Sequence, residues 1–414
     1  MSLVAGFFSI FTMATISTVP IEDANALNCS QVDASSYGRC DIDRDISEEG
    51  FRDCVNNVNC FATQTVNVQN TLRSSEEAKI HLDLEQYLNC GNPDCLNVDN
   101  QQEAFNIANQ RVAVTSAGSS VVDFDVDAHM NQRSDGEGQE VYIQDNTGTQ
   151  EFLINAANSA NVDADGDGND VEFRMDQFND ECDNSDCSNS ASQQYEVLAQ
   201  GTSRVDISSD TGFTVNQLNN GCDNFDNQGL TDEVRCFNSS TQELNILTPN
   251  PSSTTTNRAT VIYDTLGPST TEQTTDCEFG DINCANTAES FVNIGAIGTS
   301  RVDMDDIEQD VSQYIDCDNG VGMDCQNQAF LNVAVQAESD GIINVNQGSQ
   351  TATQSSSCDD DADCIQIADL FVGLGVDAGG INAVTGTLNT NYNQEVTQIA
   401  DCEDASCTNN AIMN

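Results

Sequence analysis

The chain has 414 residues, in which 68 Asp and Glu outnumber 12 Lys and Arg, so the formal net charge is −56 at pH 7. Such a surface repels phosphate backbones and anionic membrane surfaces, which argues against nucleic acid as a partner, and it attracts divalent cations.

The N-terminus carries the pattern of a secretory signal. Residues 3–16 form an apolar run, and Ala24 and Ala26 supply a small-x-small cleavage pattern. No Lys or Arg precedes Arg39, so the basic region that commonly opens a signal peptide is missing. The run is too short and too interrupted for a membrane span. We predict a signal peptide over residues 1–26 and a secreted mature chain without a membrane span, located outside the cell or on its surface.

All 18 cysteines fall into neighbouring pairs. Zinc knuckles favour cysteines separated by two to four residues, which these pairs lack, so the spacing favours small-loop disulfides and an oxidising compartment. The predicted pairs are Cys29–Cys40, Cys54–Cys60, Cys90–Cys95, Cys182–Cys187, Cys222–Cys236, Cys277–Cys284, Cys317–Cys325, Cys358–Cys364 and Cys402–Cys407.

A short phrase, Cys-x-Asn-x-Ala, follows the second cysteine of several pairs, and two identical Gly-Thr-Ser-Arg-Val-Asp segments begin 14 residues after Cys187 and Cys284. These offsets predict a repeated unit of about 40 residues. We expect an N-terminal cap region over 27–89, a β-repeat region over 90–401 and a partial repeat over 402–414. The phrase occurs at Asn189 with Ala191, Asn286 with Ala288, Asn327 with Ala329 and Asn409 with Ala411, and in variant form at Gln366 with Ala368.

Apolar and polar residues alternate along many short segments, such as 122–126, 331–335 and 343–345, and this period of two predicts strands. An all-β solenoid is the favoured fold, with each unit forming roughly two rungs and the cysteine loops at one corner. An array of small β-sandwich domains is the alternative, although a sandwich needs about 100 residues and the unit is smaller.

The units resemble the curlin repeats of bacterial curli fibre subunits and the cysteine-bearing, Asn/Gln/Asp-rich repeat proteins of archaeal surfaces. The resemblance implies a secreted β-solenoid or amyloid-like surface protein without enzymatic activity. Curlin units are shorter and lack paired cysteines. The matching residues are Asn189 and Ala191 with Gln200 and Gln217, and Asn327 and Ala329 with Gln336 and Gln347.

One acidic segment has the alternating carboxylates of a calcium loop. It is not a full EF-hand, because the twelfth position is Arg174 rather than Glu. An acidic, solvated turn is the other interpretation, and Ca²⁺ is the only cofactor that the sequence suggests. The expected ligands are Asp163, Asp165, Asp167, Asn169 and Glu172.

Catalytic patterns are weak. The chain has neither a Gly-x-Ser-x-Gly elbow nor a Walker loop, and we expect its two histidines, His81 and His129, on the surface. The sequence therefore predicts a non-enzymatic structural protein of the cell surface or extracellular matrix, a disulfide-stapled rod that assembles into fibres. Its expected partners are itself, other surface proteins and divalent cations. A calcium-dependent adhesin or binding module is the alternative.

Overall fold

The computed structural model describes most of the chain after the predicted signal segment. The described residues are 27–30, 38–45, 52–53, 59–70, 75–89, 103–135, 143–164, 171–180, 182, 186–207, 211–223, 234–248, 258–263, 266–278, 282–318, 323–338, 341–359, 362–377, 387–403 and 405–414.

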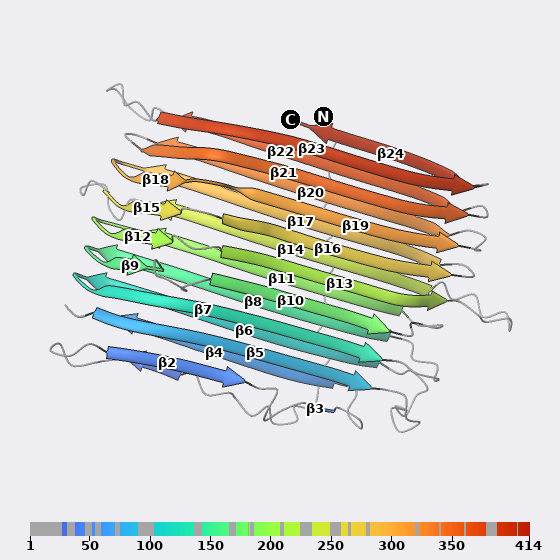
Figure 1. The fold of residues 1–414 in the computed structure, drawn as a ribbon, viewed down its shortest axis with the longest axis horizontal. Helices are drawn as coiled ribbons and strands as arrows, with labels where there is room; N and C mark the ends of the chain where they lie inside the picture. Colours follow the sequence, from blue (N-terminus) through green and yellow to red (C-terminus); the bar gives the residue numbers. More distant parts are fainter. Residues whose placement is uncertain are drawn as a thin grey trace.

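Two parallel β-sheets face each other, and their strands stack in chain order from β2 at one end to β24 at the other (Figure 1). The first sheet, sheet A, has ten strands. They are β1 (Leu27–Ser30), β4 (Asn59–Asn70), β6 (Glu103–Gly118), β8 (Ile143–Asn158), β11 (Asp186–Ala199), β14 (Val234–Thr248), β17 (Ile282–Ile297), β20 (Asp324–Glu338), β22 (Asp363–Asp377) and β24 (Ser406–Met413).

The second sheet, sheet B, has fourteen strands, because several coils cross it as two shorter strands. They are β2 (Gly38–Asp45), β3 (Arg52–Asp53), β5 (Ser75–Asn89), β7 (Val121–Asp135), β9 (Asn161–Asp163), β10 (Val171–Asp180), β12 (Arg204–Ile207), β13 (Thr211–Asp223), β15 (Thr260–Tyr263), β16 (Leu266–Glu278), β18 (Arg301–Met304), β19 (Glu308–Asp318), β21 (Ile342–Asp359) and β23 (Thr387–Glu403).

Each repeat unit forms one coil of a β-solenoid. The chain crosses sheet A in β11, turns into β12 and β13 of sheet B, and returns to sheet A in β14, beside β11. The solenoid prediction is therefore confirmed, and continuous sheets through all units exclude an array of sandwiches. The expectation of two rungs per unit was wrong. The strands of sheet A are long enough for one coil to use about 40 residues.

The core lies between the sheets because side chains alternate strictly along each strand. In β17 every second residue is buried, and Val292, Ile294 and Ala296 all face inward. Parallel, in-register pairing then places each inward residue on the equivalent residue of the next coil. Aromatic rings stack in this way near the middle, where Phe152 and Tyr195 have ring centroids 4.9 Å apart.

The twin Gly-Thr-Ser segments are the turns from sheet A to sheet B. Gly201 and Gly298 adopt φ values of +77° and +80°, which a residue without a Cβ adopts at little cost. After the turn, Arg204 pairs with Asp206 on the outer face, and Arg301 pairs with Asp303 in the same way. The repeated hexapeptide thus encodes a turn followed by a short strand with an external ion pair.

The solenoid is about as tall as it is wide. Ten sheet-A strands spaced by about 4.8 Å give a height of about 45 Å, and strands of about 15 residues give a width of about 50 Å. A single copy is thus a block, and a rod requires several copies on one axis. The described residues contain no helix that could cross a bilayer.

Candidate functional site

A ladder of buried asparagines runs through sheet A and explains the repeated Cys-x-Asn-x-Ala phrase. Each side-chain amide donates to the side-chain oxygen of the next asparagine at 2.8 to 3.1 Å, across 40 to 49 residues of chain. The alanines, two residues further on, occupy equivalent inward positions, and Ser240 fills that position in the coil between Ala191 and Ala288. The ladder consists of Asn106, Asn146, Asn189, Asn238, Asn286 and Asn327, and Gln366 and Asn409 continue its register.

A second ladder of glutamines runs through sheet B. Each Nε2 donates to the Oε1 of the preceding glutamine at 2.7 to 3.0 Å. The asparagine amides donate toward the C-terminal end of the solenoid, whereas these glutamine amides donate toward the N-terminal end. The ladder consists of Gln86, Gln132, Gln177, Gln217, Gln273, Gln313, Gln354 and Gln398.

The remaining amide hydrogens connect the two sheets. Gln217 donates to Gln177 at 2.8 Å and to the main-chain oxygen of Ser239, in sheet A, at 2.9 Å. Asn189 likewise donates to the main-chain oxygen of Leu218, in sheet B, at 3.0 Å. A buried amide costs free energy unless its hydrogens are bonded. Because each of these amides bonds both to the next coil and to the facing sheet, the same side chains fix the register of the coils and the distance between the sheets.

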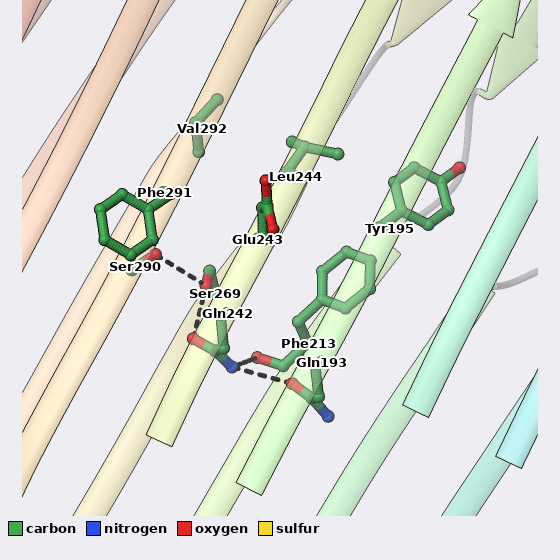
Figure 2. Close-up of a pocket in the computed structure, with 10 residues that line it drawn as sticks. All are labelled: Gln193, Tyr195, Phe213, Gln242, Glu243, Leu244, Ser269, Ser290, Phe291 and Val292. Carbon is green, nitrogen blue, oxygen red and sulfur yellow. Dashed lines mark hydrogen bonds between the residues drawn. The ribbon is translucent and has the colours of Figure 1, made fainter. Parts of the chain in front are cut away.

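Another polar column changes sheets near the middle of the molecule. In sheet A, glutamine amides donate from Gln242 to Gln193 and onward to earlier coils. Figure 2 shows the point of exchange, where Ser269 of sheet B donates to Gln242 at 2.6 Å and lies 3.4 Å from Ser290. In the following coils the glutamines belong to sheet B, beginning with Gln309.

The exchange point also leaves a small pocket. Two serines replace larger side chains there, and Gln193, Tyr195, Phe213 and Leu244 line the space with them. The lining side chains include hydrogen-bonded polar groups and aromatic rings, and Glu243 is the one carboxylate among them. We assign no chemistry to this pocket.

Disulfides form a column along one edge of the solenoid. The structure pairs Cys182–Cys187, Cys222–Cys236, Cys277–Cys284, Cys317–Cys325, Cys358–Cys364 and Cys402–Cys407, which confirms six predicted pairs. The other three pairs lie outside the side chains that the structure describes.

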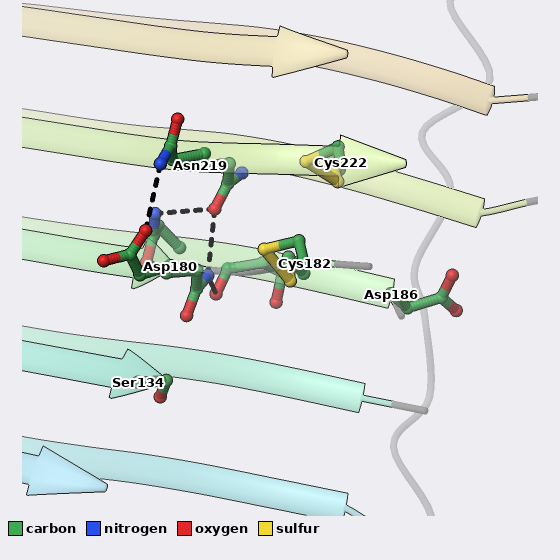
Figure 3. The surroundings of a disulfide bond; sticks show 12 residues. Ser134, Asp180, Cys182, Asp186, Asn219 and Cys222 are labelled. Atoms are coloured by element: carbon green, nitrogen blue, oxygen red, sulfur yellow. Dashed lines mark hydrogen bonds between the residues drawn. A yellow bond between two sulfur atoms is a disulfide. The ribbon is translucent and has the colours of Figure 1, made fainter. Parts of the chain in front are cut away.

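Each disulfide joins the end of a sheet-B strand to the start of the next sheet-A strand. Successive disulfides lie side by side, as the neighbouring positions of Cys182 and Cys222 show in Figure 3. The cysteines of the first five described disulfides are buried, whereas Cys402 and Cys407 of the sixth are half-buried.

The last coil, formed by β23 and β24, exposes residues that are buried in earlier coils. Met413 occupies the inward position held by Leu370 one coil earlier, yet it is 54% exposed, whereas Leu370 is 1% exposed. Gln398 of the glutamine ladder is half-buried, and Asn409 and Ala411 of the repeat phrase are exposed. Within the described residues, no further coil covers this end.

A charged cluster lies on the outer face of sheet B. His129 contacts Asp176 at 3.0 Å and Asp83 at 3.5 Å, and Arg174 contacts Asp176 at 2.8 Å. The hydrogen bond that His129 donates to Asp176 raises the pKa of His129 against the opposing effect of burial. Burial acts to raise the pKa of Asp176, but the bonds from His129 and Asn216, with the charge of Arg174, lower it overall. This ion-pair network joins β5, β7 and β10, and His81 is exposed beside Asp127 on the same face.

The predicted calcium loop falls where sheet B is interrupted between β9 and β10. Asp163 ends β9 and pairs in register with Asp206, and Glu172 lies on the exposed side of β10. The other expected ligands, Asp165, Asp167 and Asn169, lie outside the described residues. Calcium binding at this loop stays a prediction.

Sequence reasoning missed most of the glutamine ladder. Of the four glutamines matched to curlin repeats, only Gln217 belongs to a ladder, whereas Gln336 and Gln347 are exposed and Gln200 lies at a turn. A signal was present, because Gln313 and Gln354 recur with the coil period, 41 residues apart.

No protein-family model, curated protein or solved structure matches this chain. The disulfide-rich, all-β repeat architecture is compatible with an extracellular structural protein, and disulfides in such number fit an oxidising, extracellular compartment.

Proposed function

We propose that this chain is a secreted, non-enzymatic structural protein of the cell surface or extracellular matrix, and that its copies stack end to end into fibres. The last described coil, which no other described coil covers, is the observation that carries the proposal. Its strands present a row of main-chain hydrogen-bonding groups at the edge of each sheet, and such edges template further strand pairing.

The partner that fits this end is a second copy of the chain. Every coil pairs with the next in parallel and in register, so a translated copy continues both sheets along the same axis. Its contacts are head-to-tail, and contacts of this kind that do not close into a ring generate an open fibre. The side-chain oxygen of Gln398 and the Met413 side chain lie at the end of the stack, in the positions where the last coil covers Gln354 and Leu370 one coil earlier.

The charge of the chain shapes this assembly. With a net charge of −56, copies repel one another side by side, and divalent cations or salt reduce that repulsion. Growth along the axis is favoured by strand pairing and apolar burial at the end coil, whereas lateral contacts depend on the cation concentration. We therefore expect Ca²⁺ to bundle fibres more than to form them.

Two neighbouring residues of β24 test the proposal. Met413 faces the core position and Ile412 faces outward, and both are about half exposed in a single copy, at 54% and 44%. Met413→Glu buries a carboxylate when a second copy stacks, which is costly without a partner. Ile412→Glu adds the same charge on the outer face and serves as the control.

Negative-stain microscopy of the purified full chain gives the result. We expect fibres for the wild type and for Ile412→Glu, and single blocks for Met413→Glu. Fibres that form equally with both variants would contradict end-on stacking. Single blocks for the wild type that bind immobilised glycans only with Ca²⁺ would favour the calcium-dependent adhesin.

A further inference from the structure

The two sheets divide the described residues into different numbers of layers, where a layer is the level that one coil occupies along the solenoid axis. In sheet B five layers hold two strands each, as β2 and β3 do beside β5, and as β18 and β19 do beside β21. The fourteen strands of sheet B therefore fill nine layers, whereas the ten strands of sheet A fill ten. A fibre in which copies repeat along one axis needs equal numbers of layers in both sheets.

The outermost strands of sheet A, β1 and β24, occupy different columns, where a column is the set of residues in register from strand to strand. β24 pairs with β22 as far as Leu370, and the main chain of Asn414 bonds to Leu370 and Val372. Figure 1 shows β24 reaching only part of the way across the sheet. The registers of the intervening strands place Leu27 of β1 in the column of Val372. The columns of β1 therefore begin where those of β24 end.

The part of β22 beyond β24 has no neighbour on that side among the described residues. Val372 is half-buried, whereas Val333, at the same inward position one coil earlier, is 1% exposed. Gly373 and the residues after it have no register partner in β24. Main-chain groups of a strand are satisfied by a neighbouring strand, and β1 has the register of residues 372–375. A strand like β1 thus fits beside this part of β22.

We propose that β24 of one copy and β1, β2 and β3 of the next copy form a single shared coil, an inference that rests on the end-to-end stacking proposed above. In this coil β1 continues the row of β24 beside β22, and β2 and β3 lie beside β23. β4 of the second copy then lies beside β24, with Ala62 in the column of Ala411. Each copy contributes nine layers to both sheets, so the two sheets grow in step.

The glutamines at the end of sheet B match the residue types that β2 and β3 bring to the joint. Gln394 and Gln398 donate their amides to the preceding coil at 2.9 and 2.8 Å, which leaves their side-chain oxygens to accept from the next layer. Arg44 stands in the column of Gln394, and Arg52 stands in the column of Gln398. Arginine side chains only donate, so the residue type at both positions suits these acceptors.

The distribution of charge favours the same order of ends. No Lys or Arg follows Arg301, so the coils at the C-terminal end of the stack contain acidic residues without basic ones. Five of the 12 Lys and Arg fall in residues 27–89. Head-to-tail contact therefore brings basic residues to an acidic end, whereas two C-terminal ends repel each other.

Cryo-electron microscopy of fibres of the full chain measures the number of layers per copy. Nine layers spaced by about 4.8 Å give an axial repeat of about 43 Å, whereas a joint without a shared coil needs ten layers and about 48 Å. We expect the shorter repeat. The longer repeat would overturn the shared coil and leave end-to-end stacking in place, whereas the absence of fibres would overturn both.

An engineered disulfide tests the contact between β1 and β22. Asn28 and Gly373 share a column, so in the shared coil their Cα atoms are about 4.8 Å apart, a distance that a disulfide spans. A Cβ at Gly373 meets only the ring of Phe371, which can move aside. β1 and β22 lie near opposite ends of one copy, so this bond links two copies. We expect the double variant Asn28→Cys/Gly373→Cys to form covalent multimers on non-reducing gels.

The matched control is the double variant Asn28→Cys/Asn410→Cys. Asn410 lies in the column of Ile367, six residues before Gly373, so in the shared coil it is about 20 Å from Asn28 along the row and forms no bond. Without a shared coil, Asn28 and Gly373 are two layers apart, about 10 Å, which is too far for a disulfide. Fibres of the first variant without covalent multimers, or multimers from the control alone, would overturn the proposal.

Discussion

Asn189 and Asn238, 49 residues apart in the chain, are joined by a buried side-chain hydrogen bond of 2.9 Å from the amide of Asn189 to the oxygen of Asn238. Each is in the second position after a cysteine, and the two cysteines, Cys187 and Cys236, also pair in register. One amide bond per coil thus fixes the register between units of different length, because a one-residue slip would turn every inward side chain outward.

Removal of one amide from the ladder is expected to cost more than its volume implies. Asn189→Ala leaves the donors of Asn146 and Asn179 without their acceptor in a buried position, so we expect the free energy of unfolding to fall by about 2 to 4 kcal/mol. Ser190→Ala, on the exposed side of the same strand, is the control and is expected to change it by less than about 0.5 kcal/mol. Urea unfolding of both variants measures the difference, and equal values would contradict the role of the ladder.

The turn glycine of the repeated hexapeptide gives a second matched pair. Gly201 has a φ of +77°, and a Cβ there would lie 2.7 Å from the main-chain oxygen of Asn158. Gly201→Ala is therefore expected to lower the free energy of unfolding by about 1 to 3 kcal/mol. Gly212→Ala meets nothing within 4 Å and is expected to be neutral or slightly stabilising. Thermal unfolding that ranks the two variants in the opposite order would contradict the turn geometry.

The ion-pair network on sheet B predicts a pH dependence of stability. The pKa of His129 is raised in the folded state, so the folded state binds the proton more tightly. Its contribution is present below the unfolded pKa of about 6.5 and is lost as the pH rises through the higher folded pKa. The groups that face it are Asp83 on β5, and Asp176 and Arg174 on β10.

The measurement compares the wild type with His129→Gln at pH 5.5 and pH 8.5. His129 is partly exposed, so we expect the variant to lose at most about 1 kcal/mol at pH 5.5 and less at pH 8.5. A difference in stability that is the same at both pH values would show that the imidazole charge contributes nothing to this network.

The cysteine period, the Asn-x-Ala phrase and the alternation of apolar residues were enough to predict an all-β solenoid with small-loop disulfides. They were not enough to predict the coil. In β20 the inward positions include Asn327 as well as Leu331 and Val333, and a polar residue facing inward breaks the apolar alternation. We therefore expected short strands and two turns of the solenoid per unit, whereas each unit forms one turn with one long strand in sheet A.

Contacts between coils could not be predicted, because they depend on register. His129 and Asp176 are 47 residues apart, and Cys325 and Cys364 come from different disulfides. Their proximity follows only once the length of each coil and its turns are known. Sequence reasoning placed both histidines on the surface and compared cysteines only within their own loops, so it predicted neither the ion-pair network nor the stacking of neighbouring disulfides.

Fibre diffraction from aligned assemblies of the full chain tests the central claim most directly, namely that copies continue one parallel solenoid along a common axis. We expect the strand spacing of about 4.8 Å as a reflection along the fibre axis, because every strand in the described coils lies across that axis. A strand-spacing reflection perpendicular to the fibre axis, or the absence of aligned assemblies under any cation concentration, would contradict the account.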